Sequence, residues 1–405
     1  MENVDYKKLN RSISIYPIFY GLTADLIFWI AINTLFLTTV KHLSASQINS
    51  IEAISTVVGI FFQLILVKIV RRIGNLNSVK LGVVLLFLSV LLNIVSKNYI
   101  GFLLAEIFYV IGFVFKHMDN VILIKDLKYL NRSDEYINYQ TKGSTIYSLI
   151  TLLISAISGF MFNINPYIPV IICLIVCFIN IILTNFIYEV PVNDKNIDNK
   201  EYKINKKYFS KKIIMMILLY GLFYAMINSG QKNSKLFIQF DLQNLFDLDK
   251  VAIYMGAFIF ISRVTRLLSN LLFLKIYNKY KSKMIFMLEF GLASAFIFLL
   301  IGHFFGNIYG IYIMALGFFM FLFIRDPFDN FMRKTLFENS SEKVHDKIVN
   351  YINLTKKVFT LMYSTIVASM LIKLNYVYVM SLFLILTISF FFLIYKIYNL
   401  IREES

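Results

Sequence analysis

The chain has 405 residues, of which 58% are hydrophobic and 16% are charged, and its mean hydropathy is +0.69. Soluble domains contain about 45–50% apolar and about 25% charged residues, so a water-soluble fold of this length would expose too much apolar surface. The net charge of +16 would suit a nucleic-acid partner, but the basic residues fall in alternate connections between apolar segments. We therefore expect an all-α membrane protein that contacts lipid and binds no nucleic acid.

A membrane-spanning helix needs about 20 mostly apolar residues. By this criterion the sequence predicts about twelve transmembrane helices. The first apolar stretch is too long for a signal peptide, so we expect it to be retained as a span. The expected spans are 12–40, 47–70, 78–96, 99–124, 140–163, 166–190, 212–238, 250–275, 284–304, 307–332, 351–373 and 375–398.

One long polar connection, 191–211, divides the chain into an expected N-terminal six-helix bundle, 1–190, and a C-terminal one, 212–405. Basic residues gather in this linker and in every second shorter connection. The positive-inside rule then places the linker and both termini in the cytoplasm of a multi-pass plasma-membrane protein. The high content of Phe, Ile, Asn, Lys and Tyr is typical of an AT-rich genome, and we expect a bacterial source.

Two sequence echoes relate the halves. Tyr20–Leu22 recurs as Tyr220–Leu222, and the run Gly112–Asn120 recurs as Phe321–Asn330, with the same Asp-Asn pair at its end. The spacing grows by about ten residues between the two echoes. We expect the extra residues in the polar segment Gln239–Lys250, which the sequence predicts to be a long connection. The halves are therefore expected to be structural repeats.

Spans halved six and six by a basic linker, with internal repeats, resemble the major facilitator superfamily. The family's loop between helices 2 and 3 reads G-x-x-x-D-R-x-G-R-R; here Arg72 and Gly74 match, and Arg71 stands at the acidic position. The resemblance implies two pseudo-symmetric six-helix bundles about a central cavity lined by helices 1, 4, 7 and 10. It also implies a monomeric secondary transporter that works by alternating access.

Aromatic, amide and basic groups lie on the expected lining faces of these helices and their neighbours. Such a wall suits an amphipathic organic solute held by ring contacts and a few hydrogen bonds, although the same rings could simply pack helix against helix. Two of the arginines could instead hold an anionic group. The expected cavity residues are Trp29, Asn33, Tyr109, Phe113, Tyr147, Tyr220, Tyr224, Asn228, Gln231, Arg263 and Arg266.

Two carboxylates, Asp25 and Glu106, fall near the middle of their expected spans. A carboxylate in a low-dielectric span can exchange protons near neutral pH, so both are candidates for proton coupling. Arg263 is the natural counter-ion for either one. If that ion pair is permanent, its role is structural, and a third possibility is that neither role applies.

A second group of charges lies in the cytoplasmic third of the expected spans. Charges of both signs at one level suggest a gate whose ion pairs form in one state and break in another, the alternative being a static network. Pro327 among them predicts a kinked helix. The expected gate residues are Lys116, Asp119, Asn120, Arg325, Asp326, Asp329, Asn330, Lys356 and Lys357.

The sequence contains no enzyme signature that we recognise: we find no phosphate-binding Gly-rich loop, no His-Glu-x-x-His pair and no Gly-x-Ser-x-Gly turn. We expect that the protein is not an enzyme and binds neither a metal nor a cofactor. Cys173 and Cys177 are expected to be small buried thiols. The favoured function is proton-coupled export of a small, amphiphilic organic solute. Two alternatives stay open: a proton-coupled importer of a peptide, amino acid or organic anion, and a membrane scaffold or sensor that transports nothing.

Overall fold

The structure is a computed structural model that describes residues 5–132, 135–190, 210–340 and 345–402. These residues are helical almost throughout, and no strand occurs among them. The chain folds into two compact units. Unit 1 comprises residues 1–42 and 54–200, and unit 2 comprises residues 43–53 and 201–405. Most of the expected linker, 191–209, lies outside the described residues.

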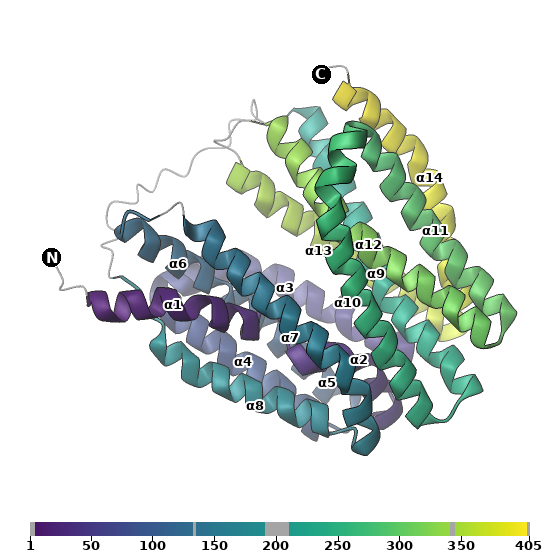
Figure 1. Cartoon of the computed structure of the whole chain (residues 1–405), viewed down its shortest axis with the longest axis horizontal. Coiled ribbons are helices and arrows are strands. Elements are labelled where there is room, and N and C mark those ends of the chain that lie inside the picture. Colours follow the sequence, from purple (N-terminus) through teal and green to yellow (C-terminus); the bar gives the residue numbers. More distant parts are fainter. Residues whose placement is uncertain (1–4, 133–134, 191–209, 341–344, 403–405) are drawn as a thin grey trace. The chain divides into compact units, whose positions relative to one another are not determined.

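Unit 1 is built from the N-terminal helices, purple to teal in Figure 1. Asp5 caps the first helix by accepting from two backbone N–H groups, and Asn98 caps α5 by accepting from one, that of Gly101. The first turns of α3 belong to unit 2. The elements are α1 (Tyr6–Thr23), α2 (Ile27–Leu35), the π-helical turn η1 (Phe36–Val40), α3 (Ala45–Ile73), α4 (Asn75–Val95), α5 (Tyr99–Lys116), α6 (Met118–Tyr129), α7 (Tyr136–Ile164), α8 (Ile168–Leu183) and the 3-10 turn η3 (Thr184–Phe186).

Unit 2 is built from longer helices, green to yellow in Figure 1. Gly306 closes α11 with a positive φ of 59°, a backbone conformation that glycine adopts without strain. Residues 43–53 pack within this unit, where Asn49 donates to Asn233 at 3.1 Å. The elements are α9 (Lys211–Leu245), α10 (Leu248–Tyr280), the 3-10 turn η6 (Lys281–Lys283), α11 (Met284–Phe305), α12 (Ile308–Glu338), α13 (His345–Lys373) and α14 (Tyr376–Arg402).

Eleven segments among the described residues are long and apolar enough to cross a membrane. This confirms the prediction of a multi-pass, all-α membrane protein. The remaining predicted span corresponds to α13, a 29-residue helix that is not among the eleven. Its apolar stretch is interrupted by Lys356 and Lys357 and ends at Lys373. The apolar character of α13 is therefore weaker than that of the other spans.

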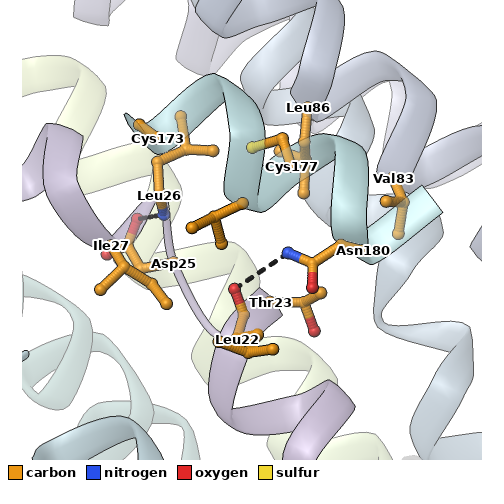
Figure 2. Close-up of a pocket in the computed structure, with 11 residues that line it drawn as sticks. Leu22, Thr23, Asp25, Leu26, Ile27, Val83, Leu86, Cys173, Cys177 and Asn180 are labelled. Carbon is orange, nitrogen blue, oxygen red and sulfur yellow. Dashed lines mark hydrogen bonds between the residues drawn. The ribbon is translucent and has the colours of Figure 1, made fainter. Parts of the chain in front are cut away.

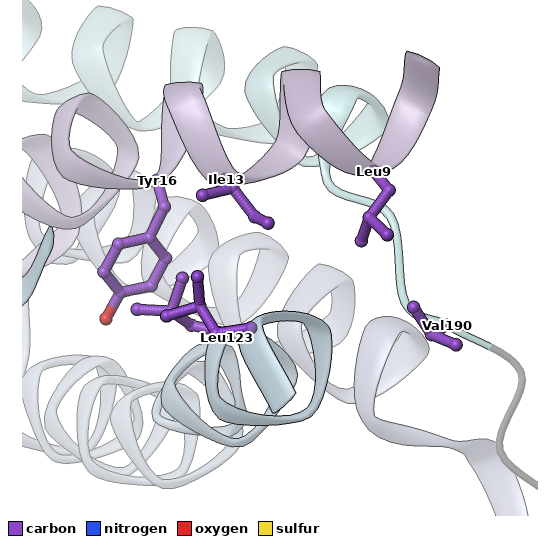
Figure 3. Close-up of a cluster of buried hydrophobic side chains, with 6 residues drawn as sticks. Leu9, Ile13, Tyr16, Leu123 and Val190 are labelled. Atoms are coloured by element: carbon purple, nitrogen blue, oxygen red, sulfur yellow. The ribbon is translucent and has the colours of Figure 1, made fainter. Parts of the chain in front are cut away.

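Several predicted boundaries were wrong. The first span, expected as one helix over 12–40, is interrupted between α1 and α2. The sixth, expected to reach residue 190, ends as a helix at Phe186, and residues 187–190 continue without helical structure. Val190 there packs against Leu9 and Leu123 in a buried cluster (Figure 3), and its N–H donates to Asp126 at 3.1 Å. Tertiary packing thus replaces the last helical turn.

The segment Gln239–Lys250 was also predicted wrongly. Helix α9 continues through most of it, and only Phe246 and Asp247 separate α9 from α10. Gln239 and Leu242 are completely buried, so this polar-looking stretch still has an inward face. The extra residues of the second half therefore lengthen a helix instead of a loop.

The echo of Tyr20–Leu22 in Tyr220–Leu222 has a packing counterpart in each unit. A Cβ on Gly21 would lie 2.5 Å from a methyl carbon of Ile146 on α7, and one on Gly221 would lie 2.7 Å from Thr355 on α13. Both glycines therefore allow the first helix of their half to approach the fifth closely. The echo marks equivalent helix–helix contacts.

Candidate functional site

The break in the first span carries the clearest candidate for chemistry. Asp25 lies in the three-residue gap between α1 and α2. Its Oδ1 accepts from the backbone N–H of Leu26 at 2.7 Å and from the hydroxyl of Tyr109 at 3.0 Å. On the other side of the gap, Asn180 of α8 donates its amide to the carbonyl oxygen of Leu22 at 3.2 Å (Figure 2). Interrupted backbone inside a membrane needs such partners, so the break is stabilised from two neighbouring helices.

A small cavity of about 10 Å³ borders the break, which is room for about one water molecule. Its wall joins the residues of the gap to the apolar faces of α4 and α8 (Figure 2). Cys173 and Cys177 belong to this wall, and both are free, buried thiols, as predicted. The aspartate thus sits beside a pocket that is mostly apolar.

Tyr109 connects several of the predicted residues. It interacts electrostatically with Asp25, Glu106 and Tyr147, and its ring packs edge-on to Phe113 with 4.7 Å between the centroids. The two predicted proton-coupling carboxylates therefore share one tyrosine as a neighbour. This arrangement gives Asp25 a hydroxyl partner from α5, the helix that carries Glu106.

Two other residues predicted to line the cavity have local roles in this structure. Trp29 is only 8% exposed and packs edge-on against Phe36, with ring centroids 5.8 Å apart. The side-chain oxygen of Asn33 accepts from the N–H of Thr34 at 2.8 Å. Trp29 therefore contributes to the core of unit 1.

A fully buried ion pair lies where α5 meets α6. Lys116 Nζ is 3.0 Å from Asp119 Oδ2, and both side chains are 1% exposed. The ammonium group also lies 4.7 Å from the ring centroid of Tyr20. Asn120 donates to Asp119 Oδ1 through its N–H at 2.8 Å and accepts from the hydroxyl of Tyr16 at 2.9 Å. Three of the predicted gate residues thus form one network in unit 1.

Unit 2 holds a related cluster around Asp329. Its Oδ1 lies 2.5 Å from both the hydroxyl of Tyr220 and the Nζ of Lys356, and its Oδ2 lies 2.9 Å from Arg333 Nε. Lys356 also contacts aromatic rings, at 4.4 Å from the Tyr220 centroid and 3.7 Å from that of Tyr224. The repeat therefore places a tyrosine, a lysine and an aspartate together in each unit. In unit 1 the lysine precedes the aspartate by three residues, whereas the lysine of unit 2 comes from α13, which follows the helix of Asp329 in the chain.

A further network joins predicted cavity and gate residues in unit 2. Asp326 Oδ2 accepts from Arg266 Nε at 2.6 Å, and its Oδ1 accepts from Arg325 Nε at 3.2 Å. Arg325 also donates to the amide oxygen of Gln231 at 2.9 Å. Arg266 is thus engaged by a carboxylate of the protein itself.

The other predicted residues of unit 2 are more dispersed. Asn228 forms a side-chain hydrogen bond with Tyr224 on the same helix, and Arg263 interacts electrostatically with Lys235 of α9. Lys357 is partly buried, whereas Asn330 is exposed at the surface of unit 2. The α12 helix runs through Pro327 without ending.

Sequence reasoning missed two polar clusters away from the linker. Asp241 Oδ2 lies 2.9 Å from His303 Nδ1, and the hydroxyl of Tyr376 contacts both groups. This cluster borders a cavity of about 120 Å³. In unit 1, Lys41 donates to the carbonyl oxygens of Ile94 at 2.7 Å and of Ser96 at 3.0 Å. No local spacing links these residues, so no pattern in the sequence could have found them.

No protein-family model matches the sequence, and a search of curated protein sequences finds no match either. Solved structures do match. The nucleoside transporter NupG superposes with a TM-score of 0.73 at 10% identity, over 96% of this chain and 99% of NupG. A bacterial homologue of the iron transporter ferroportin, in an inward-facing state, gives 0.66 at 14% identity, over 98% and 99%. A bacterial homologue of the human lysosomal transporter Spinster gives 0.61 at 11% identity, over 98% and 97%.

These likenesses cover nearly the whole chain, although few residues are shared. They establish the class of fold: a multi-pass helical membrane protein with the major facilitator fold. The fold predicted from the sequence is confirmed.

Proposed function

We propose that this protein is a secondary active transporter that moves a small, amphiphilic organic solute by alternating access, with proton coupling and in the direction of export. The observation that carries the proposal is the break in the first span, where Asp25 accepts hydrogen bonds from Leu26 and Tyr109. An ionisable side chain within a membrane span is costly, by roughly 2.5–3.5 kcal/mol on insertion scales, and marks function by default. In transporters of several folds, interrupted helices form substrate and ion sites.

The neighbours in fold support transport and differ in cargo, from nucleosides to iron. Among the described residues no group of three or more His, Cys, Asp or Glu side chains gathers to hold a metal ion. Tyrosine and amide groups are frequent at the proposed site instead, and these suit ring contacts and hydrogen bonds to an organic solute. Nucleosides are therefore the first substrates to test.

The charge clusters around Asp119 and Asp329 fit the proposed cytoplasmic gate. Lys116 pairs with Asp119 in unit 1, and Lys356 pairs with Asp329 in unit 2. Asp126, seven residues after Asp119, accepts from Val190, and Tyr220, which bonds Asp329, lies nine residues after Lys211 at the start of α9. The linker is proposed to face the cytoplasm together with both termini. In this proposal the pairs exchange partners when the transporter changes state.

The test is solute flux in proteoliposomes with an imposed pH gradient. A nucleoside panel is compared with iron(II), using the wild type, Asp25→Asn and Glu135→Gln. Glu135 is a partly exposed carboxylate bonded to Arg132 at the α6–α7 connection, where that hydrogen bond lowers the pKa of Glu135. We expect proton-driven flux in the wild type and in Glu135→Gln. Asp25→Asn should retain exchange of solute without a gradient and lose proton-driven accumulation.

Proton-driven flux at the wild-type level in Asp25→Asn would refute the coupling role. Flux directed inward, measured with right-side-out vesicles, would favour the importer. In that case the anion clamp would have to work without Arg266, which Asp326 already binds. Absence of flux for every solute in an otherwise folded protein would favour a scaffold or sensor.

A further inference from the structure

Helix α11 carries a buried carboxylate that the proposed transport path does not use. Glu289 is 4% exposed, and both of its carboxyl oxygens lack a hydrogen-bond partner among the described residues. It lies five residues after Met284, where α11 begins, which is about 7.5 Å along the helix axis. The carboxyl group is therefore only about one and a half turns from the basic connection η6.

The surroundings of Glu289 are apolar. On the same stripe of α11 lie Ile285, Leu292 and Phe296, which are 3%, 0% and 1% exposed. Helices α12 and α14 make the most extensive contacts with α11. Helix α12 approaches α11 through Ile324, which lies within contact distance of Gly291. No polar group of the described residues forms a hydrogen bond with the carboxyl group there.

The charged and titratable groups on the neighbouring elements are engaged elsewhere. On α12, the arginines and aspartates are bonded to one another and to α9, α10 and α13. On α9, the tyrosines face the Asp329 cluster. On α14, one tyrosine packs its ring against Phe286 and another is exposed. These groups are Arg325, Asp326, Asp329 and Arg333 of α12, Tyr220 and Tyr224 of α9, Tyr395 and Tyr398 of α14, and the exposed Lys275, Lys279, Lys281 and Lys283 around η6.

An ionised carboxylate buried without a partner is strongly unfavourable, and such a group binds a proton instead. We propose that Glu289 is a proton-binding site of unit 2, neutral while α11 is packed, which releases its proton to water when this face of α11 opens. The step breaks the carboxyl O–H bond, transfers the proton to water and leaves a carboxylate that needs hydration. Protonation and packing of α11 are therefore linked.

This inference is independent of the proposed function, because Glu289 binds a proton whether or not the protein transports a solute. It also differs from the role proposed for Asp25, which already accepts two hydrogen bonds. Proton binding at Glu289 adds a second ionisable position, in the other half of the chain.

Infrared spectroscopy of the purified full-length protein tests the protonation state. The wild type at neutral pH should show a C=O stretching band of a neutral carboxylic acid that is lost in Glu289→Gln. Glu135→Gln is the matched control, because Glu135 is partly exposed and bonded to Arg132, and it should leave the band unchanged. The difference spectrum is the wild-type spectrum minus that of Glu289→Gln. If it contains carboxylate bands and no band of a neutral carboxylic acid, the proposal is overturned.

The pH dependence of stability gives a second readout, because proton binding and folding are thermodynamically linked. A glutamate in the unfolded chain is ionised above about pH 4.3, so a folded protein that keeps this proton loses stability as the pH rises. The unfolding temperature of the wild type should fall relative to that of Glu289→Gln between about pH 5 and pH 8. The rate of amide hydrogen exchange in residues 284–305 should rise with pH by more than the intrinsic exchange rate does. This extra rise should occur in the wild type only. Glu289→Leu, which removes the polar group as well as the charge, should follow Glu289→Gln; parallel curves for all three proteins would contradict the link.

Discussion

The buried pair between Lys116 and Asp119 permits a quantitative test of what holds unit 1 together. Replacing Lys116 by Met leaves the Asp119 carboxylate 1% exposed and without its cation. Breaking a buried ion pair from one side costs about 3–5 kcal/mol. Asp119 keeps two hydrogen bonds from Asn120, so we expect about 3 kcal/mol, the lower end of this range. Removing both charges, in Lys116→Met/Asp119→Leu, should return the stability to within about 1 kcal/mol of the wild type.

The assay is equilibrium unfolding in mixed micelles, followed by tryptophan fluorescence. The chain has a single tryptophan, Trp29, which is buried in unit 1 and therefore reports on the unit that carries the pair. Lys8→Met is the control, because Lys8 and Asp5 form an exposed pair at 3.4 Å that should contribute nothing measurable. If Lys116→Met costs less than about 1 kcal/mol, or the double variant is as unstable as the single one, the account of a stabilising buried pair is wrong. A stable double variant with impaired flux would favour the gate over a static network.

Two further substitutions test the helix break and the repeat. Asn180→Leu removes the donor to the Leu22 carbonyl and should destabilise the protein by about 1–3 kcal/mol in the same unfolding assay; wild-type stability would show that the break needs no partner there. Gly221→Ala places a Cβ 2.7–2.8 Å from side-chain and backbone atoms of Thr355 and should cost about 1–3 kcal/mol in thermal unfolding. Wild-type thermal stability in Gly221→Ala would argue against a special close contact at this position.

The membrane class and the fold could be predicted because they depend on features that repeat along the sequence. Runs of about 20 apolar residues mark the spans, and the shared Tyr-Gly-Leu motif marks equivalent helices. The motif kept its meaning because Gly21 and Gly221 each meet a neighbouring helix too closely for a side chain. Equally, the Asp-Asn echo led to two charge clusters, a buried one around Asp119 and a partly exposed one around Asp329.

What the sequence did not predict depends on contacts between distant residues. The break at Asp25 contains neither Gly nor Pro, whereas Pro17 lies inside α1 without ending it. Tyr109 of α5 bonds the Asp25 side chain and Asn180 of α8 bonds the Leu22 carbonyl, and local propensity contains no information about these partners. Lys356 is a comparable case, because its pairing with Asp329 depends on the packing of α13 against α9, which in turn packs against α12. Glu289 escaped notice because one carboxylate in a long apolar run resembles any other polar interruption.

The interruption of the first span makes Asp25 both a chemical group and a mechanical joint. The carboxylate holds the N–H that begins α2, and its partner hydroxyl comes from Tyr109 on another helix. A proton or a solute that bound this oxygen would compete with the contacts that join α1 to α2 across the gap. In the proposed transport cycle such binding would shift α2 relative to α1, and a designed crosslink between the two helices should uncouple binding from this shift.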